Sequence, residues 1–329
     1  MRVDMHVHFY PKAYVDELAK MGIGEEAGVG IKIPVWSTIE ERIAEMDRTG
    51  VDVELLGLSA PNVYFPDAGL SRSLAQMTND FAADICRKRP DRFLALASIP
   101  LNNMDYAMTE LDRATGKLGL HGLLLGTNVN QIALSDDRFL PFLEEVAKRR
   151  IPVAIHPMKA IGQDAMPAED AALVIPTNVG FVFDTTRTLA EMTLKGTFER
   201  LPDLTFVLPH SGGAIPFLCG RLDLAVLSRP EGHRLHKLPH LPSYYLKRQY
   251  YDLAHAYTKG PLACTIDFAG IDHVMYGTDW PYTNDIRWTT LENNLGTYGF
   301  TAEELEKVNW RNAAMLFPSV RPRRLPTEP

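Results

Sequence analysis

Cysteine is scarce in this chain, with three residues among 329: Cys86, Cys219 and Cys264. No two of them lie close enough in the sequence to form a CxxC pair, and one would remain unpaired in any disulfide arrangement. Thiols used this sparingly are typical of proteins in a reducing compartment. The first residues are predicted to form a strand and not a signal peptide. We therefore expect a cytoplasmic location.

Long apolar runs and an excess of positive charge are also missing. No segment reaches the roughly 18 apolar residues that a membrane-spanning helix needs, so we expect no membrane partner. The 34 lysines and arginines are outnumbered by 41 aspartates and glutamates, which gives a net charge of -7. This balance offers no attraction to a phosphate backbone, so nucleic acid is not an expected partner either. The hydrophobic content of 46% is ordinary for a globular protein with an apolar core.

Short apolar segments alternate with longer helical patterns along the chain. Segments rich in Val, Ile, Leu and Phe predict strands at 2–8, 51–59, 92–98, 120–126, 151–156, 204–210, 249–254 and 273–279. Helical patterns predict helices at 38–49, 70–89, 104–115, 137–149, 186–200, 214–227, 259–268 and 301–316. This alternation predicts an α/β fold, a single (β/α)8 TIM barrel over residues 1–318. An open doubly wound sheet fits less well, because no GxGxxG follows the first strand.

Three long connections interrupt this alternation. Residues 9–36 follow the first predicted strand, residues 158–183 follow the fifth, and residues 228–247 follow the helix after the sixth. Long loops after strands lie on the C-terminal face of a barrel, where active sites are found. The last residues, 319–329, are predicted to be a disordered tail.

Two histidines lie two residues apart near the end of the first predicted strand. Strand alternation places His6 and His8 on the same face, where a pair of imidazoles would supply half of a metal site. An HxH pair alone is equally compatible with two ordinary polar residues. His156, His210 and Asp279 each end a further hydrophobic strand. Because the C-terminal ends of barrel strands meet at one mouth, the five side chains together favour a metal centre with an acid–base group.

These residues fall within motifs that resemble the amidohydrolase superfamily. The motifs are DMHVHFYP at 4–11, RIAEMDRTGVD at 42–52, AIHP at 154–157, PHSGGAIPFLCGR at 209–221 and YGTDWP at 276–281. The resemblance covers about residues 1–318. It is closest to the amidohydrolase-related decarboxylases, the branch of the aminocarboxymuconate-semialdehyde and 6-methylsalicylate enzymes, and the stretches SAPNVYFPD and FDTTR resemble the latter type.

The resemblance implies a ligand set and a metal count. It assigns His6, His8, His156 and Asp279 as metal ligands, and His210 as a catalytic residue beside the metal. Dinuclear relatives carry a carboxylated lysine at the end of the fourth strand, but this strand, in GLHGLLLGT, has none. One divalent ion is therefore expected. Zinc suits three imidazoles and a carboxylate, although manganese and magnesium remain open. No organic cofactor is required.

Other residues are weaker candidates for substrate binding, each weighed against an ordinary structural role. Cations and aromatic rings in the long loops would hold a flat carboxylate, and a histidine after the seventh strand would reach the site. These candidates are Lys32, Trp36, Phe181, Phe183, Arg187 and His255.

The sequence therefore predicts a metal-dependent, non-oxidative decarboxylase of a small aromatic or conjugated carboxylic acid. His210 or Asp279 would protonate the carbon that loses carbon dioxide, and the residues do not decide between them. The alternative is a mononuclear metal-dependent hydrolase of a lactone, amide or ester, since one site would support both reactions. The resemblance also implies a homodimer or homotetramer, and the predicted small-molecule substrate places the enzyme in the metabolism of aromatic compounds.

Overall fold

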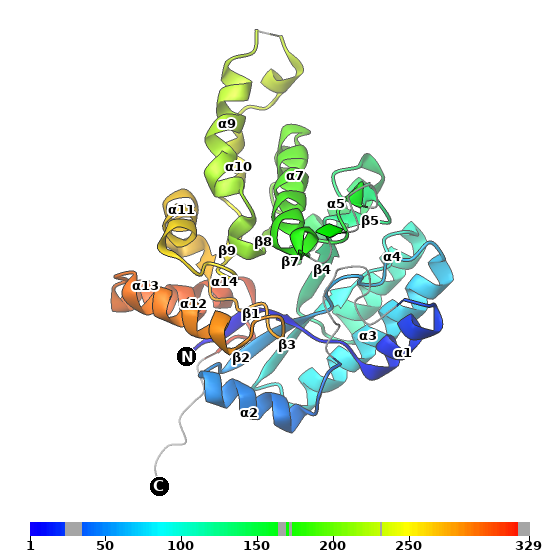
Figure 1. Cartoon of the computed structure of the whole chain (residues 1–329). Helices are drawn as coiled ribbons and strands as arrows, with labels where there is room; N and C mark the ends of the chain where they lie inside the picture. The colour runs from blue at the N-terminus through cyan, green and yellow to red at the C-terminus, as the bar shows by residue number, and fades with distance from the viewer. Residues whose placement is uncertain (24–34, 164–168, 171–172, 231, 322–329) are drawn as a thin grey trace.

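The computed structural model describes residues 1–321 apart from 24–34, 164–168, 171–172 and 231. Eight parallel strands form one sheet in the order β1-β2-β3-β4-β7-β8-β9-β10 (Figure 1). The ends of this sheet meet, because Val7 forms a parallel bridge with Trp280 and the His8 N–H donates to the Trp280 carbonyl at 2.7 Å. The strands are β1 (Val3–His8), β2 (Val53–Gly57), β3 (Phe93–Ser98), β4 (Gly122–Gly126), β7 (Val153–His156), β8 (Phe206–Leu208), β9 (Tyr250–Asp252) and β10 (Val274–Met275). The predicted (β/α)8 barrel is confirmed.

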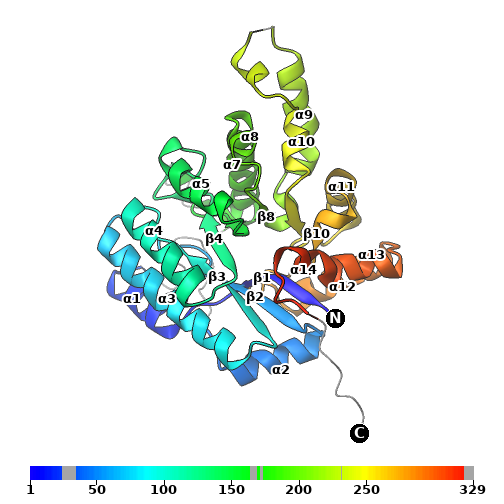
Figure 2. The ribbon, with the colours of Figure 1, turned by 180° about the vertical axis from the view of Figure 1, so that it is seen from behind.

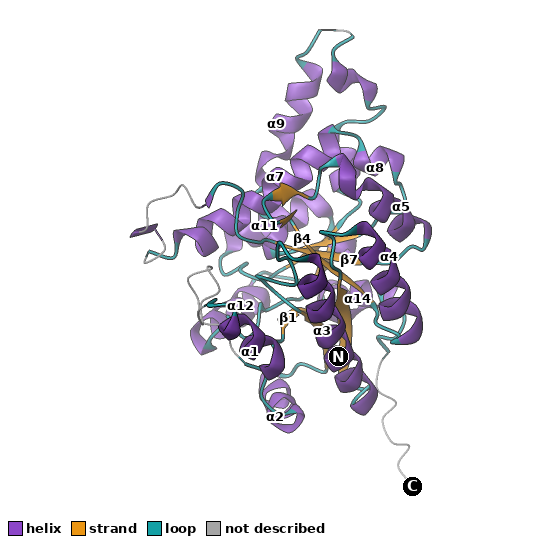
Figure 3. Cartoon of the chain, turned by 90° about the vertical axis from the view of Figure 1, so that its right-hand side faces the viewer, coloured by secondary structure: helices purple, strands orange, loops and turns teal. Residues whose placement is uncertain are grey.

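Helices surround the strands on the outside of the barrel (Figure 3). In chain order they are α1 (Lys12–Lys20), α2 (Ile39–Thr49), α3 (Ala68–Lys88), α4 (Met104–Asp112), α5 (Leu140–Lys148), α7 (Phe181–Leu194), α8 (Thr197–Arg200), α9 (Ile215–Leu227), α10 (Pro242–Leu246), α11 (Lys259–Ala269), α12 (Asp285–Thr297), α13 (Ala302–Glu306) and α14 (Asn312–Leu316). A small hairpin, β5 (Asn128–Val129) with β6 (Ile132–Ala133), lies between β4 and α5. Helices α9 and α10 extend beyond the rest of the molecule at the top of Figure 1. In the described part of the chain, no helix has the length and apolarity that crossing a bilayer would require.

Local sequence explains where several helices begin and end. Thr38 and Glu41 form a capping box at the start of α2, and Gly50 ends that helix with φ 68°. Asp67 caps α3 through the Leu70 N–H. Asn284 caps α12 in the same way through the Arg287 N–H. These caps position the helices that follow β1, β2 and β10.

The apolar core has two layers. A large cluster lies between the strands and the helices, and a smaller one fills the barrel with side chains such as Val3, Met5, Leu55 and Leu96. Phe317 also joins the inner cluster. It directly follows α14, which lies near the N-terminus of the chain in the view from behind (Figure 2). The barrel is therefore packed along its length, and only its mouth is available for ligands.

A register shift in β1 sets the direction of the His6 and His8 side chains. Val3 and Met5 belong to the cluster inside the barrel, whereas Val7 belongs to the outer one. Pairing with β2 shifts by one residue between Asp4 and Val7, as in a β-bulge. The alternation therefore reverses, and His6 and His8 continue the inward row above Met5.

Several predicted boundaries were wrong, each for a local reason. All eight predicted strands exist, but β8 and β10 are much shorter than residues 204–210 and 273–279, because the chain leaves the ladder before His210 and Asp279. The predicted loop at 158–183 ends early, since α7 begins at Phe181 and not at 186. The predicted loop at 9–36 contains α1, and α12 was not predicted at all. The predicted tail at 319–329 lies mostly outside the described residues.

Candidate metal centre and active site

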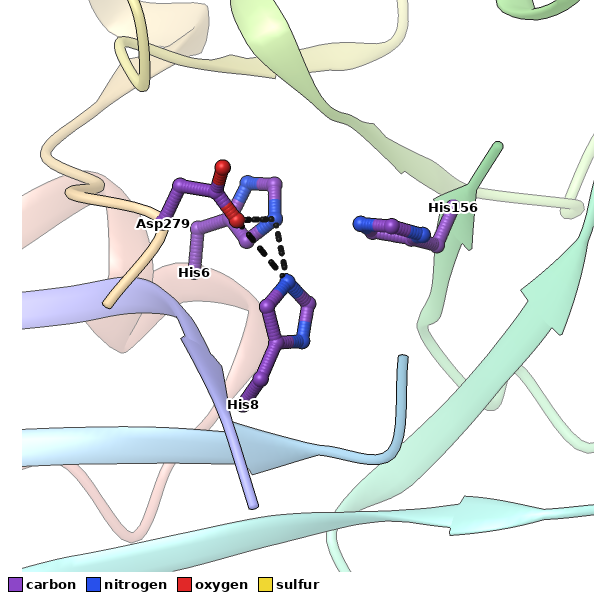
Figure 4. A group of neighbouring side chains, drawn as sticks. All are labelled: His6, His8, His156 and Asp279. Carbon is purple, nitrogen blue, oxygen red and sulfur yellow. Dashed lines mark hydrogen bonds and ion pairs between the residues drawn. The ribbon is translucent and has the colours of Figure 1, made fainter. Parts of the chain in front are cut away.

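Four side chains with metal-binding donors meet at the mouth of the barrel. His6 and His8 come from β1, His156 ends β7, and Asp279 lies in the loop after β10. All four are buried. In Figure 4, His6, His8 and Asp279 lie together on one side and His156 faces them across a gap. The structure thus brings together the whole predicted ligand set, from both ends of the chain.

The distances among these donors are those of ligands that share one ion. The Nε2 atoms of His6 and His8 are 3.1 Å apart. Asp279 Oδ1 lies 3.3 Å from His6 Nε2 and 3.0 Å from His8 Nε2. Nitrogen and oxygen ligands at about 2.0–2.2 Å from a common ion lie roughly 3.0–3.6 Å from each other. With His156 included, the four donor atoms all lie within 4.8 Å of one another, so the residues fit a divalent metal.

Each imidazole is oriented by an acceptor at its other nitrogen. His6 Nδ1 lies 2.8 Å from Asp252 Oδ2, and His8 Nδ1 lies 3.1 Å from the Gly57 carbonyl oxygen. His156 Nδ1 lies 2.8 Å from the carbonyl oxygen of Pro157. A proton on each Nδ1 satisfies these contacts and leaves each Nε2 free to bind a metal. This arrangement is usual for histidine ligands, whose affinity depends on such partners.

The charges of this group also favour a cation. Burial opposes protonation of His6, but Asp252 and Asp279 outweigh it and raise the pKa of His6 to about 9. Burial acts to raise the pKa of Asp279, but the surrounding imidazoles, His6 foremost, hold that pKa well below its usual range. Asp279 is therefore ionised, and the cluster binds positive charge, either as a proton on His6 or as a metal ion.

The second oxygen of Asp279 faces two further histidines. His255 Nε2 lies 2.9 Å from Asp279 Oδ2, and His210 Nε2 lies 3.7 Å from it. Burial, only partly offset by Asp279, lowers the pKa of His210 to about 4, so its ring is neutral at pH 7. Asp279 therefore joins two groups whose donor atoms lie close enough together to hold a metal ion: Oδ1 lies with His6 and His8, and Oδ2 lies with His210 and His255.

The backbone of this second group is unusual. His210, His255 and Asp279 have φ values of 53°, 66° and 64°, in the left-handed region that non-glycine residues seldom adopt. Asp252 helps to hold this conformation, because its Oδ1 accepts the N–H groups of His210 and Ala254, each at 3.0 Å. Such strain is often found at functional sites, where the surrounding structure fixes it. One carboxylate, Asp252, thus supports both the His6 ring and the backbone of this second group.

A cavity of about 360 Å³ opens above these residues. Its lining combines donor groups at the base with apolar and aromatic side chains on the walls, as is common for small-molecule sites. The lining residues are Ser59, Ala60, His156, Val174, Thr177, Asn178, Phe181, Val182, His210, His255, Asp279, Pro281, Tyr282, Asn284 and Arg287. The size suits a ligand of one ring.

The structure brings only some of the predicted substrate-binding residues to this cavity. Phe181 and His255 line it, and the Phe181 ring meets His156 edge-on at 6.1 Å. Phe183 is 55% exposed, and Arg187 forms an ion pair with Glu191 at 2.8 Å; neither lines the cavity.

The two candidates from the first long loop lie elsewhere. Trp36 is partly buried in the outer core cluster, where its ring meets Phe9, Phe81 and Trp280. Lys32 lies outside the described residues.

Sequence reasoning missed several polar side chains that line the cavity, and Tyr282 and Arg287 are the two largest of them. Tyr282 follows Asp279 by three residues, and its hydroxyl lies 2.7 Å from that of Tyr10. Its proximity to the YGTDWP motif was the available signal. Arg287 lies in the first turn of α12. It was missed because that helix was not predicted, although Asn284 is a recognisable N-cap residue.

Comparisons with known proteins agree with this geometry. A family described as Amidohydrolase matches residues 3–319. The chain is 29% identical to a 2-amino-3-carboxymuconate-6-semialdehyde decarboxylase of Dictyostelium discoideum, over 90% of this chain and 89% of the relative. It is 30% identical to a gamma-resorcylate decarboxylase of a Rhizobium species, over 76% and 81%. The solved structure of a 5-carboxyvanillate decarboxylase from Sphingomonas paucimobilis matches with a TM-score of 0.83 and 26% identity, over 96% of this chain and 98% of that one.

Proposed function

This chain belongs to the amidohydrolase family and is a carboxy-lyase, and from that premise we propose that it decarboxylates a small aromatic or conjugated carboxylic acid without an oxidant. The observation that carries the proposal is the position of Asp279, whose two oxygens lie with His6 and His8 on one side and with His210 and His255 on the other, at the base of a one-ring cavity. The names of its relatives support an aromatic substrate, since gamma-resorcylate and 5-carboxyvanillate are both aromatic acids.

His6, His8, His156 and Asp279 would hold one divalent ion. When bound, such an ion stabilises the negative charge that develops on the substrate during decarboxylation. We propose zinc, because three imidazoles and one carboxylate suit it. Manganese and magnesium are the alternatives, and elemental analysis of carefully prepared protein distinguishes the three. The expected stoichiometry is about one ion per chain.

The remaining residues would bind the ring and move a proton. Phe181, the first residue of α7, and Tyr282, in the loop between β10 and α12, would contact the ring of the substrate. The Asp279–His210 pair, a carboxylate and a neutral imidazole at pH 7, would take up a proton from solvent when the substrate binds and deliver it to the carbon that bears the carboxylate, where a new C–H bond forms. The C–C bond to the carboxylate breaks, its electron pair stays on the ring carbon, and carbon dioxide leaves. No redox cofactor is needed, because the conjugated ring accepts the electron pair.

The reaction is tested with metal-loaded enzyme and a panel of hydroxybenzoates in deuterated water. We expect release of carbon dioxide and one deuterium at the carbon that carried the carboxylate. The competing hydrolase would instead convert lactones, amides or esters. Turnover of those compounds with none of the acids would overturn the decarboxylase proposal.

The assembly of the enzyme is a second part of the proposal. We propose that residues 1–318 form one domain, and that two or four copies of the chain associate in the cytoplasm. Helix α9 supports self-association, because Phe217, Leu224 and Leu227 are 79%, 65% and 61% exposed on it. Burying such side chains is favourable, and a second copy offers the same face.

Light scattering tests the assembly. Wild type should be a dimer or tetramer, and the double variant Phe217→Glu with Leu224→Glu should be a monomer. A monomeric wild-type protein would exclude the assembly.

A further inference from the structure

Arg287 is a cation in the cavity wall whose side chain makes few contacts with the rest of the protein. Its Nη1 donates to the Tyr282 carbonyl oxygen at 3.1 Å, and its backbone N–H is capped by Asn284. A guanidinium has five N–H donors, so most of them have no protein acceptor in the part of the chain that the structure describes. Within that part, Arg287 also has no carboxylate at ion-pair distance. No acidic side chain among the described residues therefore balances the charge of Arg287.

Local structure does not account for this charge. Arg287 lies in the first turn of α12, where the helix dipole disfavours a cation by about 0.3–1 kcal/mol. The nearby acid in that turn, Asp285, pairs with Arg48 at 2.8 Å instead. An arginine at this position lowers the stability of α12, and no ion pair with a described residue offsets that loss. This is the pattern expected when a residue serves a ligand.

Arg187 shows what an ordinary structural arginine looks like in this protein. It lies on α7, pairs with Glu191 four residues later at 2.8 Å, and is 56% exposed outside the cavity. Arg287 differs on each point, since it is half-buried, lacks an acidic partner among the described residues, and lines the cavity. It is also the only lysine or arginine among the described residues that line this cavity.

We propose that Arg287 binds a second carboxylate of the substrate, distinct from the one that is lost. This inference rests on the proposed function and specifies its substrate class: a ring that carries the scissile carboxylate and a further anionic substituent. Asp279 and Arg287 both line the cavity without an ion pair between them, so one ligand could reach the metal ligands and the guanidinium with different atoms. A guanidinium fork matches a carboxylate with two parallel hydrogen bonds.

Two nitrophenols test the inference without requiring turnover. In 2-nitrophenol and 4-hydroxy-3-nitrobenzoate the nitro group stands for the scissile carboxylate, and the second compound adds one carboxylate. Calorimetry measures the dissociation constants of both for metal-loaded wild type, Arg287→Gln, Arg287→Lys and, as a matched control, Arg187→Gln. Metal content and melting temperature establish that each variant is folded and loaded.

We expect wild type to bind 4-hydroxy-3-nitrobenzoate roughly 10-fold or more tightly than 2-nitrophenol, as a charged hydrogen bond predicts. Arg287→Gln should lose this preference and keep its affinity for 2-nitrophenol, Arg287→Lys should be intermediate, and Arg187→Gln should match wild type. Equal weakening of both compounds in Arg287→Gln would show a structural role through Tyr282 and overturn the inference. A wild type that binds both without preference would also overturn it, and leave the proposed function standing. If wild type binds neither while the hydroxybenzoate panel still releases carbon dioxide, the inference alone fails; if that panel is also inert, the proposed function fails with it.

Discussion

The base and the wall of the cavity are built in different ways. At the base, His6, His8 and Asp279 are buried, lie at strand ends or just beyond, and have partners for more than one atom. On the wall, Phe181 and Arg287 are half-buried, belong to the first turns of two helices, and make few contacts.

From this difference we expect the base residues to carry out the reaction and the wall residues to select the substrate. The base residues hold one another through short contacts, so each replacement disturbs the metal or the proton. The wall residues contact a ligand more than they contact each other, so their replacement should change which acid binds. Four substitutions, ordered from the largest expected effect to the smallest, test this separation.

Asp279→Asn should cause the largest loss, because Asp279 belongs to both groups at the base. An amide keeps the shape but removes the charge that attracts the metal and the carboxylate that faces His210 and His255. We expect kcat to fall by about 10³-fold or more, together with a lower metal content. Steady-state kinetics with elemental analysis measures both. Retention of a tenth of the activity at full metal content would show that Asp279 has no role in proton transfer.

His210→Ala should abolish turnover by a different route. Its imidazole faces the acid–base oxygen of Asp279 and not the metal donors, so we expect a loss of about 10²–10⁴-fold in kcat with metal retained. His6→Ala is the matched comparison, because it removes a metal ligand from the same cluster. If His210→Ala lost its metal as completely as His6→Ala, the division of Asp279 into two sides would be wrong.

Asp252→Asn should weaken metal binding without removing a ligand. Asp252 orients His6 through Nδ1 at 2.8 Å, and partners of this kind contribute about 10–100-fold to metal affinity. Competition with a chromogenic chelator measures the change. Asp267→Asn, at an exposed position on α11, is the control and should bind metal like wild type. An Asp252 variant with unchanged metal affinity would mean that strand packing alone orients His6.

Phe181→Ala should have the smallest effect and should act on substrate binding. Loss of an aromatic contact of about 0.5–1.5 kcal/mol predicts a rise in KM of roughly 2–12-fold with kcat nearly unchanged. Phe183→Ala is the control, since Phe183 lies on the same helix but is 55% exposed. If Phe181→Ala lowered kcat and left KM unaltered, Phe181 would take part in the chemical step, and the separation of base from wall would be wrong.

The base could be predicted from sequence because its residues end hydrophobic strands. A strand buried on both faces is a strong local pattern, and a histidine or aspartate at its end stands out against it. His6, His156 and Asp279 were found in this way and are brought together as expected. The β1 register shift was not predictable, because it arises from pairing with β2 and leaves no local signal.

The wall was harder to predict because it depends on where helices begin. The sequence does not distinguish Phe181 from Phe183, because the orientation of the helical segment that runs from Pro176 through α7 decides which of the two rings faces the cavity. Arg187 looked like a substrate-binding cation, but helical spacing pairs it with Glu191. Arg287 could not be predicted as a cavity residue, because α12 was not predicted. The identity of the wall residues is therefore set by tertiary placement more than by motif.

The contact between the first strand and the segment after the last one also constrains biosynthesis. His8 and Asp279 are 271 positions apart, yet their side chains lie 3.0 Å from each other. At about 5–20 residues per second, a ribosome needs roughly 14–54 s to make the intervening chain. Throughout that interval the two N-terminal histidines have been synthesised without the carboxylate they require. The complete set of four donors is therefore available only after Asp279 has been synthesised, and it forms when the first strand meets the segment after the last one.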